Sequence, residues 1–391
     1  MTYDFSTMLD RSKTGSIKWG EHPESNYCPF SIADSDLPLA PEILEGLRAA
    51  LTDDLSLGYN EATAEYKQSV KNWFHRRHHY DIQEDWLVLM PGVVTALGTA
   101  IRSLTKPGDA VVILTPVYGP FYRVIETADR RVAECPLINT GETYQIDFER
   151  LDHTLARDDV KMMILCSPHN PLGRVWSKEE LQKIGQLCQK HHVLLVADEI
   201  HCDLIMPGHE FHSVMEVLPE MRDRMIVCTA ASKTFNIAGQ FTSNIFIPNE
   251  EMREAFKEMK SGMGIMSVNT LGMVATQSAY DHAEAWLDDF IQLIVRNDKM
   301  VRDFFAEHYP EVYIYPLEGT YLQWLDLRDF LPCDKMKALL NKANIFLDDG
   351  DMFGELGVGF ERLNLSASTE SLQSMLNRFK EVVDAELCSM A

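Results

Sequence analysis

CTAASKTFNIAG, at residues 228–239, follows an apolar run that begins at Met225, and it introduces a single lysine, Lys233. Lysine is almost never fully buried unless it is paired. An ammonium group held against apolar strands has a lowered pKa, which makes the amine nucleophilic and able to form a Schiff base. The alternative is a lysine at a strand end whose amine reaches solvent. This stretch alone does not distinguish a buried, reactive lysine from an exposed one, so the other motifs of the chain are needed.

Short apolar runs alternate with helical patterns on both sides of this stretch. We expect seven strands, at residues 86–90, 110–114, 131–135, 161–166, 193–197, 225–229 and 243–247, and helices between them that include 93–104, 121–128 and 178–191. This alternation is typical of an α/β fold with a mostly parallel sheet covered by helices. Ligands of such sheets bind outside the carboxyl ends of the strands.

The length of 391 residues exceeds that of a usual single core, so we expect two domains and an arm. Residues 1–45 are interrupted by prolines and predict an N-terminal arm that is part of the small domain. Residues 46–280 form the predicted large domain. Residues 281–391 mix strand-like runs with helices, which predicts a smaller α+β domain.

The composition limits the classes of molecule that this protein is expected to bind. A formal net charge of -23 opposes binding to nucleic acid or to anionic membranes, so a small-molecule substrate is expected. The eight cysteines are scattered singly without metal-ligand spacing, so we expect no metal and a reducing compartment. With no signal core at the N-terminus and no run of 18 apolar residues, the chain is expected to be cytoplasmic.

Polar groups follow the predicted strands at their carboxyl ends. Gly92, Val93 and Val94 lead into a helix, where free backbone N–H groups form an anion site, or they form a plain strand-to-helix turn. Tyr118 lies between two prolines and either stacks on a flat ligand or packs.

Two further groups stand after the next strands. Asn170 lies in the string SPHNPLG, and Asp198 follows the apolar run VLLVA. A carboxylate there is unfavourable to bury without a positive partner, and a protonated ring nitrogen would serve.

This combination resembles the fold type I pyridoxal-phosphate enzymes, the aspartate aminotransferase-like superfamily, over essentially the whole chain. The resemblance implies that Lys233 binds pyridoxal 5'-phosphate through a Schiff base and that Asp198 keeps the pyridine nitrogen protonated. Asn170 would hydrogen-bond the phenolic oxygen and Tyr118 would stack on the ring. The phosphate would be held by Gly92, Val93, Val94 and Ser232, together with Tyr59 of the partner subunit in a homodimer with shared active sites.

Further motifs resemble the cystathionine/cysteine β-lyase branch, the MalY/PatB group of carbon–sulfur lyases. They are TGSIKW at 14–19, IADSD at 32–36, SKTFNIAG at 232–239 and EGTYLQWLD at 318–326. His201, in DEIH, stands where transaminases usually carry tyrosine and joins the cofactor-binding residues.

The same branch has a glycine-rich turn before an Arg-Leu-Asn strand, which matches residues 350–364. Arg362 then falls where the family binds the substrate's α-carboxylate, a role suited to a bidentate guanidinium. A structural salt bridge is the alternative. Asn170 and Ala33 are the other expected substrate contacts.

The chain departs from the family pattern at three places. Residues 366–368 read SAS where relatives commonly have Cys-Pro-Arg, and Phe241 stands eight residues after the lysine, where aspartate-type transaminases carry a phosphate-binding arginine. Ala230 replaces a frequent serine.

The resemblance implies β-elimination on an L-cysteine-type amino acid, such as cystathionine or cysteine, to give pyruvate, ammonia and a thiol. Lys233 would act as general base, with Tyr118 and Tyr59 as further catalytic residues. An aminotransferase of class I/II uses the same lysine, aspartate and arginine and is the alternative. A regulatory or interaction protein that binds the cofactor on this scaffold is the third.

Overall fold

The computed structural model describes residues 3–21 and 28–390, and its largest sheet has the strand order β2-β10-β9-β8-β7-β3-β4. β10 is antiparallel to both of its neighbours, whereas the other neighbouring pairs are parallel. The predicted seven-stranded, mostly parallel sheet is therefore confirmed. The strands are Leu87–Met90 (β2), Ala110–Thr115 (β3), Arg131–Pro136 (β4), Val160–Cys166 (β7), Leu194–Asp198 (β8), Met225–Thr229 (β9) and Ser243–Phe246 (β10).

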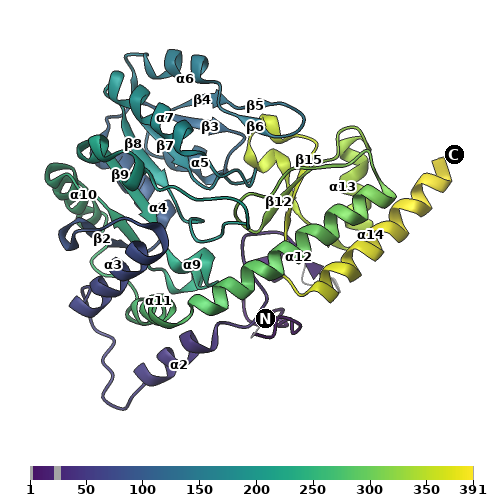
Figure 1. Cartoon of the computed structure of the whole chain (residues 1–391), viewed down its shortest axis with the longest axis horizontal. Coiled ribbons are helices and arrows are strands. Elements are labelled where there is room, and N and C mark those ends of the chain that lie inside the picture. Colours follow the sequence, from purple (N-terminus) through teal and green to yellow (C-terminus); the bar gives the residue numbers. More distant parts are fainter. Residues whose placement is uncertain (1–2, 22–27, 391) are drawn as a thin grey trace.

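Helices cover both faces of this sheet (Figure 1). Successive strand residues point to opposite faces, and in β3 Val111 and Ile113 belong to one buried cluster while Val112 and Leu114 belong to the other. The first cluster also contains residues of Val93–Leu104 (α4), Pro120–Glu126 (α5) and Glu250–Gly262 (α10). The second contains residues of Ala64–His78 (α3), Phe148–Leu155 (α6), Lys178–Lys190 (α7) and Val214–Val217 (α8).

A four-stranded sheet lies in the C-terminal part, in the order β11-β12-β15-β14. Figure 1 shows α12 and α14 running alongside each other next to it. The predicted α+β character is present here, and the exact domain boundaries stay a prediction. The elements are Glu284–His308 (α12), Tyr313–Ile314 (β11), Leu322–Asp326 (β12), Cys333–Lys342 (α13), Asp348–Asp349 (β14), Phe360–Asn364 (β15) and Thr369–Met390 (α14).

The N-terminal arm packs against this C-terminal part. Its short strand Cys28–Pro29 (β1) pairs with Ile345–Phe346 (β13), and the ring of Phe5 lies 5.5 Å from that of Trp286. Ile17–Gly20 (α1) brings Lys18 to the buried Asp36, with Nζ 2.8 Å from Oδ2. The strand pairing and the apolar contact therefore hold the arm against the C-terminal part, and the buried ion pair stabilises the fold of the arm itself.

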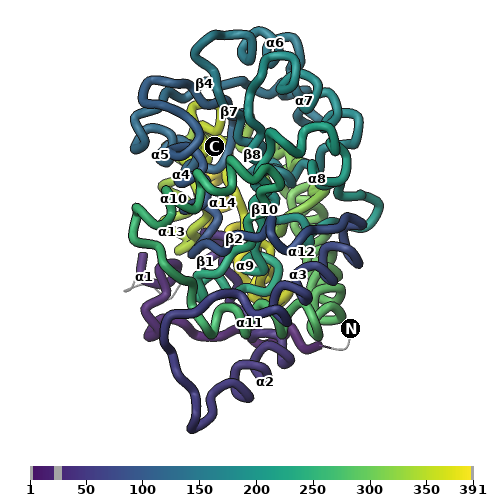
Figure 2. The backbone as a smooth tube through the Cα atoms, turned by 90° about the vertical axis from the view of Figure 1, so that its left-hand side faces the viewer, coloured from purple at the N-terminus to yellow at the C-terminus, as the bar shows by residue number. Residues whose placement is uncertain are grey.

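Pro41–Ala50 (α2) packs on Thr270–His282 (α11) at one end of the molecule. Figures 1 and 2 both show the loop between α2 and α3 extending away from the body of the chain there. The remaining elements are short: Ile138–Asn139 (β5) pairs with Tyr144–Gln145 (β6), and Ala231–Thr234 (α9) carries Lys233.

Six of the seven strands of the large sheet differ from their predicted bounds by a single residue at one or both ends, and β9 has the predicted bounds. Trp86 belongs to the 3-10 turn Glu84–Trp86 before β2, and Ile247 lies just beyond β10. Both side chains are buried, so their apolar character reflects burial in the core and not hydrogen bonding within the sheet. None of the helices in the described ranges combines the length and the apolar character needed to span a lipid bilayer.

Candidate active site

A cavity of about 540 Å³ lies at the carboxyl edge of the large sheet and reaches β14 and β15 of the small one. Tyr59 does not line it: in this single chain the residue is 93% exposed, in the loop between α2 and α3. Every other predicted site residue lines the cavity, namely Ala33, Gly92, Val93, Val94, Tyr118, Asn170, Asp198, His201, Ser232, Lys233 and Arg362.

Lys233 reaches the cavity from α9, which is separated from the end of β9 by one residue. Its Nζ donates a hydrogen bond to the carbonyl oxygen of Ala33 at 2.8 Å. Burial, followed by the nearby charge of Arg362, lowers the pKa of Lys233 to about 8, although three carboxylates oppose the shift. A substantial fraction of the amine is therefore neutral near physiological pH, as a nucleophile or a base requires.

Asp198 ends β8 and is 4% exposed. Its Oδ1 accepts a hydrogen bond from the backbone N–H of Ile200 at 3.2 Å, and within the described ranges its carboxylate forms no ion pair. Burial raises the pKa of Asp198 to about 7. A buried carboxylate with so little compensation is stabilised by a cationic group placed beside it in the cavity.

The N-terminus of α4 faces the same cavity through Val93, Val94 and Thr95. Gly92 precedes it with φ 141°, a conformation that favours glycine, and a Cβ built there would meet no atom within 4 Å. No described side chain caps this helix end. The first N–H groups of α4 are therefore available to an anion.

His201 and Tyr118 also line the cavity. Burial, Lys233 and Arg362 hold the pKa of His201 well below its ordinary value, so its ring is neutral. Its Nδ1 is buried and has no hydrogen-bond partner among the described residues. Burial also raises the pKa of Tyr118, so that phenol keeps its proton.

Arg362 is 4% exposed and is held by two side chains. Its Nε and Nη2 lie 3.1 Å and 2.6 Å from Oδ2 of Asp348, and its Nη1 lies 2.8 Å from Oδ1 of Asn170. The structural salt bridge, which the sequence left as the alternative, is therefore present. The guanidinium nevertheless lines the cavity as well.

Sequence reasoning missed Asp348, which also lines the cavity. In the sequence it is one of two consecutive aspartates before a glycine and reads as a solvated turn. Its position is set by the pairing of β14 with β15, where Asp348 stands opposite Arg362. The pattern alone does not reveal that register.

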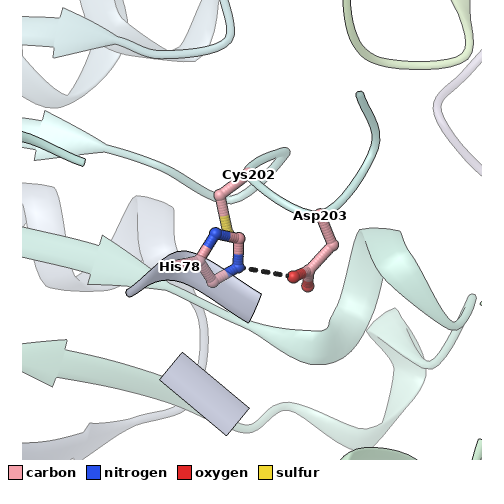
Figure 3. Close-up of side chains that lie close together, drawn as sticks. All are labelled: His78, Cys202 and Asp203. Atoms are coloured by element: carbon pink, nitrogen blue, oxygen red, sulfur yellow. Dashed lines mark hydrogen bonds and ion pairs between the residues drawn. The ribbon is translucent and has the colours of Figure 1, made fainter. Parts of the chain in front are cut away.

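His78, Cys202 and Asp203 form a buried cluster (Figure 3), and none of the three lines the cavity. Oδ1 of Asp203 accepts hydrogen bonds from Trp73 Nε1 at 3.1 Å and pairs with His78 Nε2 at 2.7 Å. Oδ2 accepts from Thr234 Oγ1 at 2.7 Å. The carboxylate is thus satisfied by protein donors, and it anchors the residue that follows Lys233.

The family model for aminotransferases of class I and II matches residues 30–379. The chain belongs to this family.

Three relatives are similar over almost the full length. Cystathionine beta-lyase PatB of Bacillus subtilis is 36% identical over 383 residues, which cover 96% of this chain and 99% of the relative. Cystalysin from Treponema denticola, whose crystal structure contains a pyridoxal 5'-phosphate cofactor, is 42% identical with a TM-score of 0.96, and the match covers 98% of this chain and 100% of that one. A PLP-bound C–S lyase from Staphylococcus hominis is 29% identical with a TM-score of 0.91, covering 98% of each chain.

Proposed function

We propose that this enzyme is a pyridoxal-phosphate-dependent carbon–sulfur β-lyase. Its substrates are L-cysteine and its thioethers, including cystathionine, and its products are a thiol, pyruvate and ammonia. The observation that supports this most is the convergence of Lys233, Asp198 and Arg362 on one cavity, from three separate elements. The full-length likeness to proteins named cystathionine beta-lyase and C–S lyase supports the same reaction.

The cavity fits the cofactor on three separate counts. Lys233 offers a buried amine with a lowered pKa for an aldehyde. Asp198 is a buried carboxylate without an ion pair in the described part, which suits a protonated ring nitrogen. The uncapped N-terminus of α4 suits a phosphate, with the Ser232 side chain as a further donor. His201 and Asn170 would contact the ring substituents, and Tyr118 would stack on the ring.

When bound, the cofactor supplies an electron-poor ring that stabilises negative charge at the substrate α-carbon. Arg362 binds the substrate carboxylate. The amine of Lys233 takes the α-proton as general base. The electron pair of the Cα–H bond then forms the Cα–Cβ double bond and expels the sulfur, which leaves as a thiol after gaining a proton. Water hydrolyses the resulting enamine to pyruvate and ammonia, so the balance requires one water and no keto acid.

An aminotransferase would use the same lysine, aspartate and arginine but would return the proton to the cofactor instead of expelling sulfur. The neutral imidazole of His201, in place of the phenol that transaminases usually carry, favours the lyase. A purely regulatory protein is disfavoured, because the lysine, aspartate and arginine needed for chemistry are all present in the cavity.

We also propose a homodimer in which Tyr59 of the partner subunit completes the phosphate site. In support, the loop that carries Tyr59 extends away from the chain, and Leu57 beside it is 64% exposed. Large apolar side chains left exposed together are typical of an interface. A cytoplasmic location is proposed because five cysteines are buried as free thiols.

The test of the proposed function is the release of thiol from a cysteine thioether with no keto acid present. A lyase turns over continuously under these conditions. An aminotransferase stops after one conversion of its cofactor and resumes only when a keto acid is added.

A further inference from the structure

Asp348 contacts two parts of the site that are distant in sequence. Its Oδ2 accepts two hydrogen bonds from the guanidinium of Arg362. The same carboxylate accepts the backbone N–H of Ile32, at 2.9 Å to Oδ2 and 3.1 Å to Oδ1. The residue is 4% exposed, so these contacts are made away from solvent.

Ile32 is held in an unfavourable backbone conformation at this contact. Its φ is 54°, in the left-handed region that β-branched residues rarely adopt. The surrounding structure has to maintain such a conformation. Here Asp348 holds its N–H, and Asn364 Nδ2 donates to its carbonyl at 2.7 Å. The next residue, Ala33, then presents its carbonyl to Lys233 Nζ.

Arg362 is restricted by the same carboxylate. A guanidinium has five N–H groups, and three of those of Arg362 are donated to Asp348 and Asn170. One N–H therefore remains on each terminal nitrogen. A pair of N–H groups on the two terminal nitrogens is what a carboxylate accepts in a bidentate contact.

We propose that Asp348 is a positioning residue that acts on two sides of the substrate site. It sets the orientation of Arg362, and it holds the backbone of Ile32 so that the carbonyl of Ala33 stays in contact with Lys233. The inference rests on the proposed function, in which Arg362 binds the substrate carboxylate. Asp348 acts through Arg362 and Ile32 and does not itself contact the reacting atoms.

Asp348 could act on Arg362 by neutralising its charge or by fixing its orientation, and the two roles predict opposite effects of Asp348→Asn on carboxylate binding. If Asp348 only neutralised Arg362, its replacement by asparagine would leave a stronger positive charge and tighter carboxylate binding. If it positions Arg362, the asparagine variant binds carboxylates more weakly. An asparagine oxygen in the place of Oδ2 is uncharged and therefore holds the guanidinium less firmly. The amide nitrogen then stands in the place of Oδ1, where it faces the N–H of Ile32 as a second donor and weakens the contact with the arm.

The experiment compares holoenzymes of wild type, Asp348→Asn, Asp348→Glu and Asp349→Asn. Asp349 is the matched control, because it lies on the same short strand but pairs with Lys337 at 2.9 Å. Propionate, a carboxylate without an amino group, is the probe, and its inhibition constant against thiol release is measured. Hydrogen exchange of the peptide that contains residues 30–36 reports on the arm independently of activity.

For Asp348→Asn we expect a rise of about tenfold or more in the inhibition constant of propionate and in the substrate KM, a smaller change in kcat, and faster exchange in the arm. Asp348→Glu keeps the charge and avoids an unpaired buried guanidinium. It displaces the guanidinium by one methylene, so the inhibition constant rises there too. Asp349→Asn is expected to stay within about twofold of wild type.

An inhibition constant for propionate that is unchanged or lowered in both Asp348 variants, with wild-type exchange in the arm, would overturn the proposal. Failure of the proposed function looks different. In that case wild type releases no thiol from any thioether, while absorbance titration of the bound cofactor with propionate still shows binding that weakens in Asp348→Asn.

Discussion

Nη1 of Arg362 lies 2.8 Å from Oδ1 of Asn170, although the two residues are 192 positions apart in the chain. Arg362 belongs to β15 of the small sheet, and Asn170 follows β7 of the large one. This hydrogen bond joins the proposed carboxylate-binding group to the proposed cofactor-binding group. The site therefore depends on how the two sheets are held together.

Replacement of Lys233 by alanine is expected to abolish thiol release, with a loss of at least about 10²–10⁴-fold from the missing general base alone. The covalent attachment of the cofactor is expected to disappear as well, and the visible absorbance should change to that of the free aldehyde. Lys183→Ala, on the exposed side of α7, serves as the control. Substantial turnover by Lys233→Ala would contradict the assignment.

Replacement of Arg362 by glutamine removes the proposed carboxylate anchor. The loss of a buried, hydrogen-bonded charge typically amounts to 2 kcal/mol or more, so KM is expected to rise about 30-fold or more. Arg362→Lys keeps the charge without the planar fork and is expected to recover only part of this. Steady-state kinetics with S-methyl-L-cysteine measure both, and an unchanged KM in Arg362→Gln would remove the arginine from substrate binding.

The pH dependence of kcat is expected to report on Lys233. The amine accepts a proton only when it is neutral, and its pKa is lowered to about 8. The rate constant should therefore fall as the pH drops below about 8. The charge of Arg362 contributes to this lowering, so in Arg362→Gln the acidic limb should move to higher pH. If the acidic limb of Arg362→Gln lies at the same pH as that of wild type, a group other than Lys233 controls the pH dependence of kcat.

Asp198 is expected to destabilise the cofactor-free protein. Its pKa in the folded chain is raised from 3.8 to about 7. A raised carboxyl pKa contributes stability when the group is protonated, and this contribution is lost as the pH rises from about 4 to about 7. Asp198→Asn should therefore stabilise the cofactor-free protein at pH 8 by on the order of a few kcal/mol, while weakening cofactor binding. Urea unfolding at pH 5 and pH 8 measures the difference, and equal stabilities of the two proteins at pH 8 would contradict the account.

The proposed sharing of Tyr59 across a dimer predicts complementation. Tyr59→Ala and Lys233→Ala are each expected to be inactive or strongly impaired as homodimers. After mixing with subunit exchange, a mixed dimer has one site that carries both intact residues, so about a quarter of the sites should become active. Thiol release that stays at the level of the separate variants would show that Tyr59 acts within its own chain or not at all.

The sequence predicted most of the large sheet because its strands are buried on both faces and read as continuous apolar runs. Lys233 and Asp198 could be predicted because a charged residue at the end of a buried apolar strand is unfavourable without a partner and therefore indicates a functional role. The role of Asp348 and the conformation of Ile32 could not be found in this way, since both depend on the register of β14 against β15 and on the contact of the arm with that sheet. The reversal of β10 was also beyond the pattern, because an antiparallel strand buried on both faces has the same composition as a parallel one.

The measurement that tests the central claim most directly is the stoichiometry of products from L-cystathionine with the holoenzyme and no added keto acid. Pyruvate and free thiol are followed together over many turnovers, with Lys233→Ala as the blank. The account predicts equal and sustained release of both. Conversion of the cofactor to its amine form by one equivalent of amino acid, without pyruvate and with restoration by a keto acid, would contradict it and identify an aminotransferase.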